Sequence, residues 1–265
     1  MTKYNIQVGD IMKSNLGGDF KIIDRINSEQ FCIEFQDNFK FCGIYGKSSI
    51  IRGYITNPYT PTIFGVGYFG EGRFKSKTNS TIDSNSKRNT KEYNAWINML
   101  QRCYYDKYIC RVQGYKSYDT VTVCDAWHNF QTFAEWYSPR LERLQKLGEK
   151  RYHLDKDILA YNKEQKLYSP DTCCVIPMRL NNLVINCNLL EYNPIVIKHL
   201  ESWSTTVSIG KSSIHLHKFK TENEAIVAGQ DLKKAYAKSL ISEYSEVIDL
   251  DVITNLCTMF NIELQ

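Results

Sequence analysis

The stretch that decides the fold is residues 153–186, which read HLDKDILAYNKEQKLYSPDTCCVIPMRLNNLVIN. Its polar residues His153, Asp155 and Asp157 alternate with other residues, as side chains do on one face of a β-strand. We therefore expect these three side chains to point to a common face of a short strand. An imidazole and two carboxylates on one face are a combination that can bind a metal ion.

The second half of the stretch predicts another strand and a helix. Residues 168–176 are expected to form the strand, and Pro177 fits the first turn of the helix that follows. On this helix Asn182 and Asn186 lie four residues apart, so their side chains would share one side. Two strands and a helix would then bring carboxylates, an imidazole and carboxamides to a common point, which suits a hard divalent cation such as Mg²⁺.

Three phrases of this stretch, LDKD, YSPDTC and VIPMRLNN, resemble the degenerate HNH motif, or ββα-metal motif, of phage-encoded homing-type endonucleases. The resemblance extends upstream to YNAWINMLQRCY at residues 93–104 and VCDAWHNFQTFAEWY at residues 123–137. Downstream, WSTTVSIGKSSIHLHKFKTENEAIVAG at residues 203–229 is similar to an AP2-type DNA-binding module. The resemblance implies a modular α+β protein with a small N-terminal β domain, a central helical and HNH-like ββα unit, and a C-terminal three-stranded sheet with a helix.

For function, the resemblance implies a metal-dependent endonuclease that hydrolyses a phosphodiester of double-stranded DNA. Asp155, Asp157 and Asn182 would bind Mg²⁺ or another divalent cation, and His153 would be the base that activates water. His128 is a second candidate base, and Lys156 could hold a phosphate oxygen. One such site implies nicking by a monomer, whereas a double-strand break would require a homodimer or two successive events.

The chain departs from the family pattern at two positions. Lys156 stands where a fully active site commonly has the His that takes a proton from water, and lysine is a poor base unless it is desolvated. Thr172 stands where the motif often carries Asn. The first departure favours an alternative, in which a catalytically impaired scaffold is a sequence-specific DNA-binding repressor or an anti-defence factor in phage conflict. Its partner could then also be a host or satellite protein.

The residue pattern of the C-terminal module predicts two strands and a helix. Residues 202–208 and 213–219 are expected to be strands joined by a turn at Gly210 and Lys211, and Thr221 with Glu224 predicts a capping box for a helix to about residue 240. Alternation would put Ile214, Leu216 and Lys218 on one side of the second strand and His215, His217 and Phe219 on the other. The resemblance implies that the sheet enters the major groove, with DNA contacts from Trp203, Lys211, His215 and Lys218. A module that only packs against the rest remains the alternative.

Composition and the positions of turn-forming residues divide the chain into four regions. Residues 1–64 predict a small β domain, because FKIID, QFCIEFQ and FKFCGIYG alternate in the manner of strands. Residues 65–90 predict a flexible basic linker, whose GxGxxG pattern lacks the following helix that dinucleotide binding needs. Residues 91–190 would form the helical and HNH-like nuclease unit, and residues 191–265 the AP2-like module. In the linker, the residues expected to contact DNA are Arg73, Lys75, Lys77, Lys87 and Arg88.

Helical spacing of apolar residues predicts two helices before the quoted stretch and one near the end. The first begins at Lys91 and carries a stripe that is expected to be core, made of Tyr93, Trp96, Met99, Leu100 and Cys103. The second is expected near residues 128–147, and residues 241–265 are expected to form a closing helix.

The charge of the chain is unevenly distributed. The net charge is +4, but residues 73–151 hold 15 Lys and Arg against 8 Asp and Glu, whereas residues 221–265 hold 3 against 8. Because phosphate neutralisation releases counterions, the central region is the part expected to attract nucleic acid. A solvated basic face is the other interpretation of such a surplus.

Cysteine usage and hydropathy suggest a cytoplasmic protein, and the resemblance to phage-encoded proteins implies that the cytoplasm is that of a host cell. The nine cysteines contain no CxxC pair, so reduced thiols are expected and structural zinc is not. No run of eighteen apolar residues and no secretory signal pattern is present, so no contact with a membrane is expected.

Overall fold

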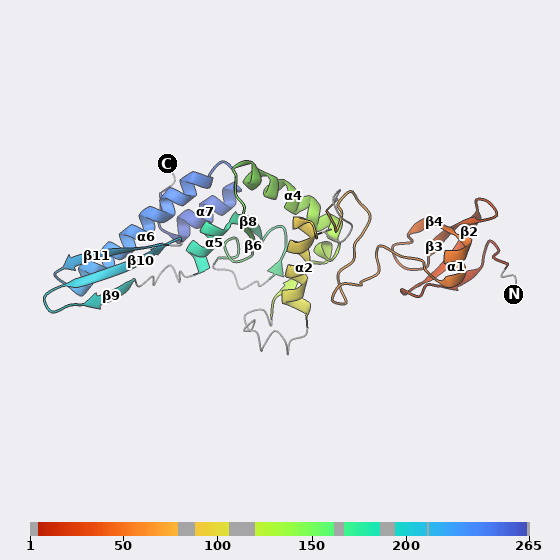
Figure 1. The fold of residues 1–265 in the computed structure, drawn as a ribbon, viewed down its shortest axis with the longest axis horizontal. Helices are drawn as coiled ribbons and strands as arrows, with labels where there is room; N and C mark the ends of the chain where they lie inside the picture. The colour runs from red at the N-terminus through yellow and green to blue at the C-terminus, as the bar shows by residue number, and fades with distance from the viewer. Residues whose placement is uncertain are drawn as a thin grey trace. The chain divides into compact units, whose positions relative to one another are not determined.

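A computed structural model of the chain describes residues 5–78, 88–105, 120–161, 167–185, 194–210 and 212–263 (Figure 1). Helices and several small sheets occur together, so the predicted α+β class is confirmed. The chain divides into two compact units, the first made of residues 1–119 and 125–134 and the second of residues 120–124 and 135–265. No helix of the described ranges is both long and apolar enough to cross a bilayer.

The first unit begins with a four-stranded antiparallel sheet. Its strands are β1 (Ile11–Lys13), β2 (Asp19–Arg25), β3 (Gln30–Phe35) and β4 (Cys42–Gly46), in that spatial order. The period-two pattern places Phe20 and Ile22 of β2 on the same buried face as Phe31, Ile33 and Phe35 of β3. The short helix α1 (Lys47–Arg52) adds Ile50 to this core. The stretches expected to be strands here are therefore strands.

Residues 65–78 are packed rather than free. Gly67 lies so close to Trp96 and Leu100 that a Cβ on it would be 2.5 Å from the Leu100 Cδ1 atom. The Gln131 side chain accepts a hydrogen bond from the Phe74 backbone N–H at 2.9 Å and donates one to the Phe74 carbonyl at 3.0 Å. These contacts contradict the flexible linker predicted for this segment, while residues 79–87 of that prediction lie outside the described residues.

Two helices that precede the quoted stretch follow the predicted spacing. Helix α2 (Lys91–Tyr104) is capped by Thr90, whose side chain accepts from the Tyr93 N–H, and it buries Trp96, Met99 and Leu100. The expected core stripe is therefore correct. A 3-10 turn, η3 (Asp125–His128), leads into α4 (Phe130–Lys146), and the Trp96 indole donates to the Trp127 carbonyl at 2.7 Å.

The quoted stretch folds into two pairs of short strands and a helix. Strand β5 (Thr122–Val123) pairs in parallel with β7 (Leu167–Tyr168), while β6 (Tyr152–Asp155) pairs antiparallel with β8 (Cys174–Pro177). Helix α5 (Met178–Ile185) follows β8 directly, so Pro177 ends the strand instead of starting the helix. The single strand expected at residues 168–176 is divided by a turn, which the Thr172 hydroxyl stabilises by donating to the Leu167 carbonyl at 2.5 Å and accepting from the Ser169 N–H at 3.1 Å.

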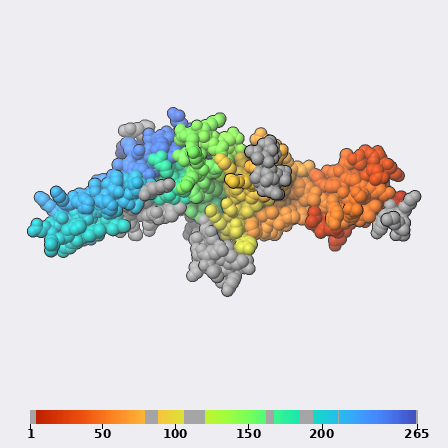
Figure 2. All heavy atoms as spheres, in the orientation of Figure 1, coloured from red at the N-terminus to blue at the C-terminus, as the bar shows by residue number. Residues whose placement is uncertain are grey.

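The C-terminal part is a three-stranded antiparallel sheet with a long helix. Strands β9 (Ile195–Lys198), β10 (Trp203–Ile209) and β11 (Ser212–Phe219) lie in the order β11-β10-β9. Helix α6 (Glu222–Tyr244) begins with the predicted capping box of Thr221 and Glu224 and runs four residues past the predicted end. The closing helix is α7 (Leu250–Met259), which is held to α4 by an ion pair between Arg140 and Asp249. In Figure 2 the cyan sheet and the blue α6 form adjacent bands.

Candidate functional site

Strands β6 and β8 with helix α5 form the candidate metal site. The register pairs His153 with Ile176 and Asp155 with Cys174, so His153 and Asp155 lie on one face of β6, as predicted from their spacing. The strand ends at Asp155, and Asp157 lies in the bend beyond it. The prediction that all three side chains share a strand face is therefore wrong for Asp157.

Asp155 is occupied by the backbone of its own turn. Its side chain is buried, with the residue 8% exposed, and its Oδ1 atom accepts hydrogen bonds from the N–H groups of Asp157 and Ile158, both at 2.9 Å. Burial raises the pKa of the Asp155 carboxyl, and these two hydrogen bonds oppose the rise in part. In this conformation Asp155 stabilises the bend that ends β6.

Lys156 and Asp157 form an ion pair beside that bend. The Lys156 Nζ atom lies 2.5 Å from the Asp157 Oδ1 atom. The lysine side chain is 12% exposed and the aspartate side chain 69% exposed. The Lys156 ammonium group therefore already neutralises the Asp157 carboxylate. A metal ion would have to compete with this ammonium group for the carboxylate.

The remaining predicted ligands do not complete a set. Asn182 lies exposed on α5, Asn181 beside it is buried, and Asn186 lies outside the described residues. Within the described ranges no group of three His, Cys, Asp or Glu side chains is placed to hold a metal ion. In this conformation the Oδ1 atom of Asp155 bonds the backbone of a turn and Asp157 is paired with Lys156, so both acids have partners other than the Mg²⁺ ion that the resemblance implies.

His128 has local partners in the first unit, whereas Asp155 belongs to the second. The His128 Nε2 atom lies 3.2 Å from the Tyr104 hydroxyl, and the two rings meet edge to face. Its Nδ1 atom is 3.9 Å from the Asp125 carboxylate. The contact with Tyr104 joins η3 to α2, whereas the contact with Asp125 lies within η3.

The basic residues predicted to meet phosphates are exposed where they are described. Residues 76–78 run antiparallel to residues 88–90, with a backbone hydrogen bond of 2.8 Å from Thr78 to Arg88. Lys77 and Arg88 are thereby brought near each other, and Lys77 donates to the Asn89 side chain at 2.7 Å. Arg73 and Lys75 are also exposed, and Lys87 lies outside the described residues.

The C-terminal sheet has one face covered by α6 and one open face. The Thr205 side chain points to α6, since a Cβ on Gly229 would lie 2.8 Å from the Thr205 hydroxyl oxygen. Val207 is fully buried on the same side. Alternation then places Ser204 and Thr206 on the opposite side, which we call the open face of the sheet. Thr206 is partly exposed on this face, whereas Ser204 is buried.

The predicted contacts of this module divide between the two faces. His215 is on the open face, because it pairs with Thr206 and its Nδ1 atom lies 2.8 Å from the Thr206 hydroxyl. Trp203 shares the α6 side with Thr205, and the Lys198 ammonium lies 5.7 Å from its ring centre. Lys218 is exposed at a positive φ of 71°, and Lys211 lies outside the described residues.

A bulge breaks the alternation predicted for the second strand. The register between β10 and β11 shifts between Trp203 and Thr205, so that Trp203 pairs with Phe219 and Thr205 with Leu216. Phe219 therefore lies on the α6 side and not with His215 and His217. The two histidine rings remain neighbours on the open face, with centres 6.3 Å apart.

The resemblance implied a third strand in this sheet, but sequence reasoning did not locate it. The structure places it at the edge as β9, which contributes Ile195 and Ile197 to the open face. These residues pair with Thr206 and Ser204 and are 65% and 50% exposed. Their β-branched run after Pro194 was the available signal, but four residues are too short a pattern to separate a strand from a loop.

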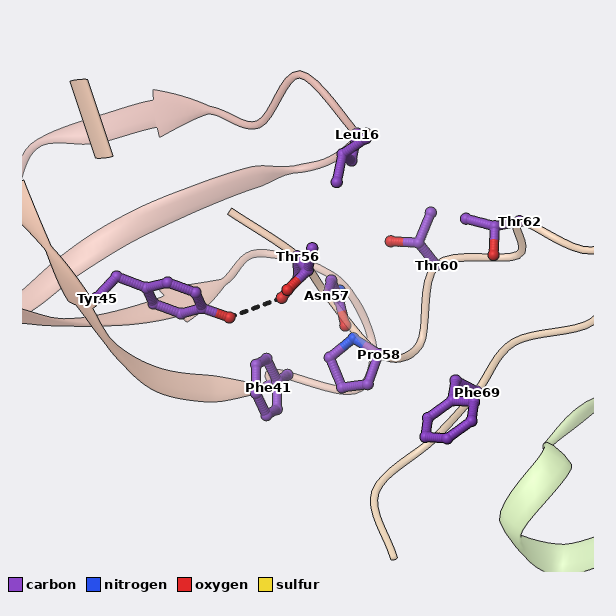
Figure 3. Close-up of a pocket in the computed structure, with 9 residues that line it drawn as sticks. All are labelled: Leu16, Phe41, Tyr45, Thr56, Asn57, Pro58, Thr60, Thr62 and Phe69. Atoms are coloured by element: carbon purple, nitrogen blue, oxygen red, sulfur yellow. Dashed lines mark hydrogen bonds between the residues drawn. The ribbon is translucent and has the colours of Figure 1, made fainter. Parts of the chain in front are cut away.

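A separate pocket lies in the first unit (Figure 3). Its volume is about 430 Å³, and the Tyr45 hydroxyl donates to the Thr56 carbonyl at 2.7 Å at its edge. All of its lining residues are uncharged, and none of them is a predicted site residue: Leu16, Phe41, Tyr45, Thr56, Asn57, Pro58, Thr60, Thr62 and Phe69. The pocket offers apolar and hydroxyl contacts without an acid or base.

Comparisons with known proteins give no match: no family model, no curated protein and no solved structure matches the chain.

Proposed function

We propose that this protein binds duplex DNA through the open face of its C-terminal sheet, on a scaffold of the HNH endonuclease type. The observation that carries the proposal is the division of charge across that module. Residues 194–220, which form the sheet, hold four lysines and one glutamate, whereas residues 221–265 hold three lysines and eight acids. A polyanion is attracted to the sheet and repelled by the helices behind it.

The shape of the module is compatible with such a role. A β-ribbon fits the major groove of B-DNA, which is about 12 Å wide. The open face presents Thr206 and His215, which can exchange hydrogen bonds with base edges, and Lys218 is exposed near the end of β11. The basic residues Lys77 and Arg88 of the first unit would add contacts to phosphates, which position a protein without specifying sequence.

The state of the ββα unit favours binding without cleavage. Asp155 caps a backbone turn, and Lys156 both stands at the position of the expected base and neutralises Asp157. A scaffold of this kind would act as a sequence-specific repressor, or as an anti-defence factor in conflict between a phage and its host.

A second candidate, the metal-dependent endonuclease, is favoured by one observation. His153 and Asp155 share a face of an antiparallel strand pair that leads directly into a helix, which is the order of elements that the resemblance to the ββα-metal motif implies. Both backbone hydrogen bonds of Asp155 go to its Oδ1 atom, so in a cleaving enzyme its Oδ2 atom would bind the metal ion. Both candidates need the same DNA-binding face.

Two assays separate the candidates. Electrophoretic mobility shifts with phage genomic fragments, at increasing salt, test binding, and relaxation of supercoiled DNA with Mg²⁺ tests nicking. Wild type that binds and leaves the DNA intact supports the first candidate. Nicking that is lost in both His153→Ala and Asp155→Asn would establish the second, and failure to bind duplex DNA at low salt would exclude both.

A further inference from the structure

The edge strand β9 exposes two large apolar side chains on the open face of the C-terminal sheet. Ile195 is 65% exposed and Ile197 is 50% exposed. Ile195 pairs with Thr206, and Ile197 pairs with Ser204, so both point away from α6. Burying these side chains against a ligand would be favourable, because each exposes apolar surface to water.

Hydrogen-bonding groups stand beside these apolar groups in the same rows of the sheet. The first row runs from Ile195 through Thr206 to His215, where the hydroxyl and the imidazole are 2.8 Å apart. The second row joins Ile197 to Ser204, but Ser204 is buried with its hydroxyl 2.9 Å from the His199 Nε2 atom, so the polar groups that a ligand can reach are those of the first row. Neighbouring strands are separated by about 4.8 Å, so an apolar contact and a polar contact lie one strand apart.

Apolar and hydrogen-bonding side chains that lie side by side are complementary to the major-groove edge of an A·T pair. In the major groove an A·T pair presents the thymine methyl group next to the thymine O4 acceptor and the adenine N6 donor and N7 acceptor. A G·C pair has no methyl group and is most often read by arginine or lysine. Residues 194–220 contain no arginine, Lys198 lies against Trp203 on the α6 side, and Lys218 lies at the bulge near the end of β11, outside the row of Ile195, Thr206 and His215.

We propose that Ile195 and Ile197 contact thymine methyl groups, so that the open face selects A·T pairs in the major groove. The inference rests on the proposed DNA binding and adds the residues that determine its specificity. Docking of another protein on the same isoleucines is the competing use of this face. The exposed lysines Lys218 and Lys220, at and just beyond the end of β11, favour the phosphate-rich ligand.

The experiment first removes the thymine methyl groups from the DNA, and protein variants then remove the isoleucine side chains. The full chain first selects duplexes from a random-sequence library without divalent metal, and the selected duplex is then made with thymidine or with deoxyuridine at every T position. Wild type should bind the deoxyuridine duplex more weakly, by about fourfold for each methyl group contacted.

Variants assign the effect to the two side chains. Ile195→Ala and Ile197→Ala should each bind the thymidine duplex more weakly and lose part of the difference between the two duplexes. Ile44→Ala is the matched control, because Ile44 is 59% exposed on β4 of the first unit and should leave both affinities unchanged. Circular dichroism and thermal unfolding establish that the variants fold.

The outcomes separate this inference from the function on which it rests. Selection of A·T-rich duplexes with a methyl effect that the isoleucine variants reduce supports it. Duplex binding with equal affinity for thymidine and deoxyuridine overturns the inference and leaves the proposed function standing. Loss of self-association in the isoleucine variants, with unchanged DNA affinity, assigns the face to protein docking and overturns it too. No duplex binding by wild type refutes the proposed function itself.

Discussion

Lys156 and Asp157 form an ion pair, with Nζ and Oδ1 2.5 Å apart, directly after the strand residue Asp155. Two carboxylates that the sequence suggests as one site thus have different surroundings. Asp155 is buried and bonded to two backbone N–H groups, while Asp157 is largely exposed and paired with an ammonium group. The difference predicts different consequences for substituting the two acids.

Asp155→Ala should lower the free energy of unfolding by about 2 kcal/mol, because two N–H groups of the bend lose their acceptor. Asp155→Asn keeps an oxygen at that position and should lose less. Asp157→Asn should change stability by less than about 1 kcal/mol, since the Asp157 carboxylate is largely exposed and solvent weakens its pairing with Lys156. Urea denaturation of the three variants measures these differences. Equal losses for Asp155→Ala and Asp157→Asn would contradict the structural role of Asp155.

The attachment of α7 to α4 should depend on pH through Asp249. Burial alone would raise the pKa of this carboxyl, but Arg143 and Arg140 together lower it below its usual value. A depressed pKa in the folded state gives stability that is present above the unfolded pKa and is lost as the pH falls through the folded pKa.

Asp249→Asn should therefore cost about 1 kcal/mol at neutral pH, and the difference from wild type should shrink toward zero in acid. Denaturant unfolding of both proteins at a series of pH values provides the measurement. Asp231→Asn, at an exposed position of α6, is the control and should show no such dependence. If the difference in stability between wild type and Asp249→Asn grows as the pH falls, the pKa of Asp249 is not lowered in the folded state.

Gly67 should not tolerate a side chain, although it lies in a segment whose composition resembles a linker. A Cβ there would be 2.5 Å from Leu100 Cδ1 and 3.0 Å from the Trp96 ring. Gly67→Ala should destabilise the first unit by about 1–3 kcal/mol, because the core must shift to admit it. At Gly46 the nearest atom to a new Cβ is 3.9 Å away, so Gly46→Ala is the control expected to be mild. Thermal unfolding of both variants tests the contrast, and similar melting curves would show that residues 65–78 are not packed as described.

The periodic elements could be predicted from sequence, whereas contacts that depend on partners distant in sequence could not. Alternation in β2 and β3 and the stripe on α2 identify the core residues, since burial follows the period of the element. Gly67 shows the opposite case, because its neighbours Trp96 and Leu100 lie about thirty residues away and leave no local pattern.

For the candidate site, spacing predicted the shared face of His153 and Asp155 correctly but not the end of their strand. The bend after Asp155 depends on its carboxylate, which accepts hydrogen bonds from two backbone N–H groups that would otherwise be available for strand pairing. The alternation of polar and apolar residues does not indicate this bend. On the C-terminal sheet the same holds for the bulge near Lys218, which moves Phe219 to the α6 side. One extra residue changes the face of every later side chain.

The basic residues Lys77 and Arg88 should contribute to DNA affinity through phosphates rather than bases. Each neutralised phosphate releases counterions, so removing one such contact should reduce the slope of log affinity against log salt by about 1. Lys77→Ala and Arg88→Ala should therefore weaken binding of selected and random duplexes alike, and Lys21→Ala, on the exposed side of β2, should change neither affinity nor slope. Fluorescence anisotropy across a salt series measures both quantities. If the two variants keep the wild-type slope, these residues belong to a solvated face of the first unit, and contact with DNA is confined to the C-terminal sheet.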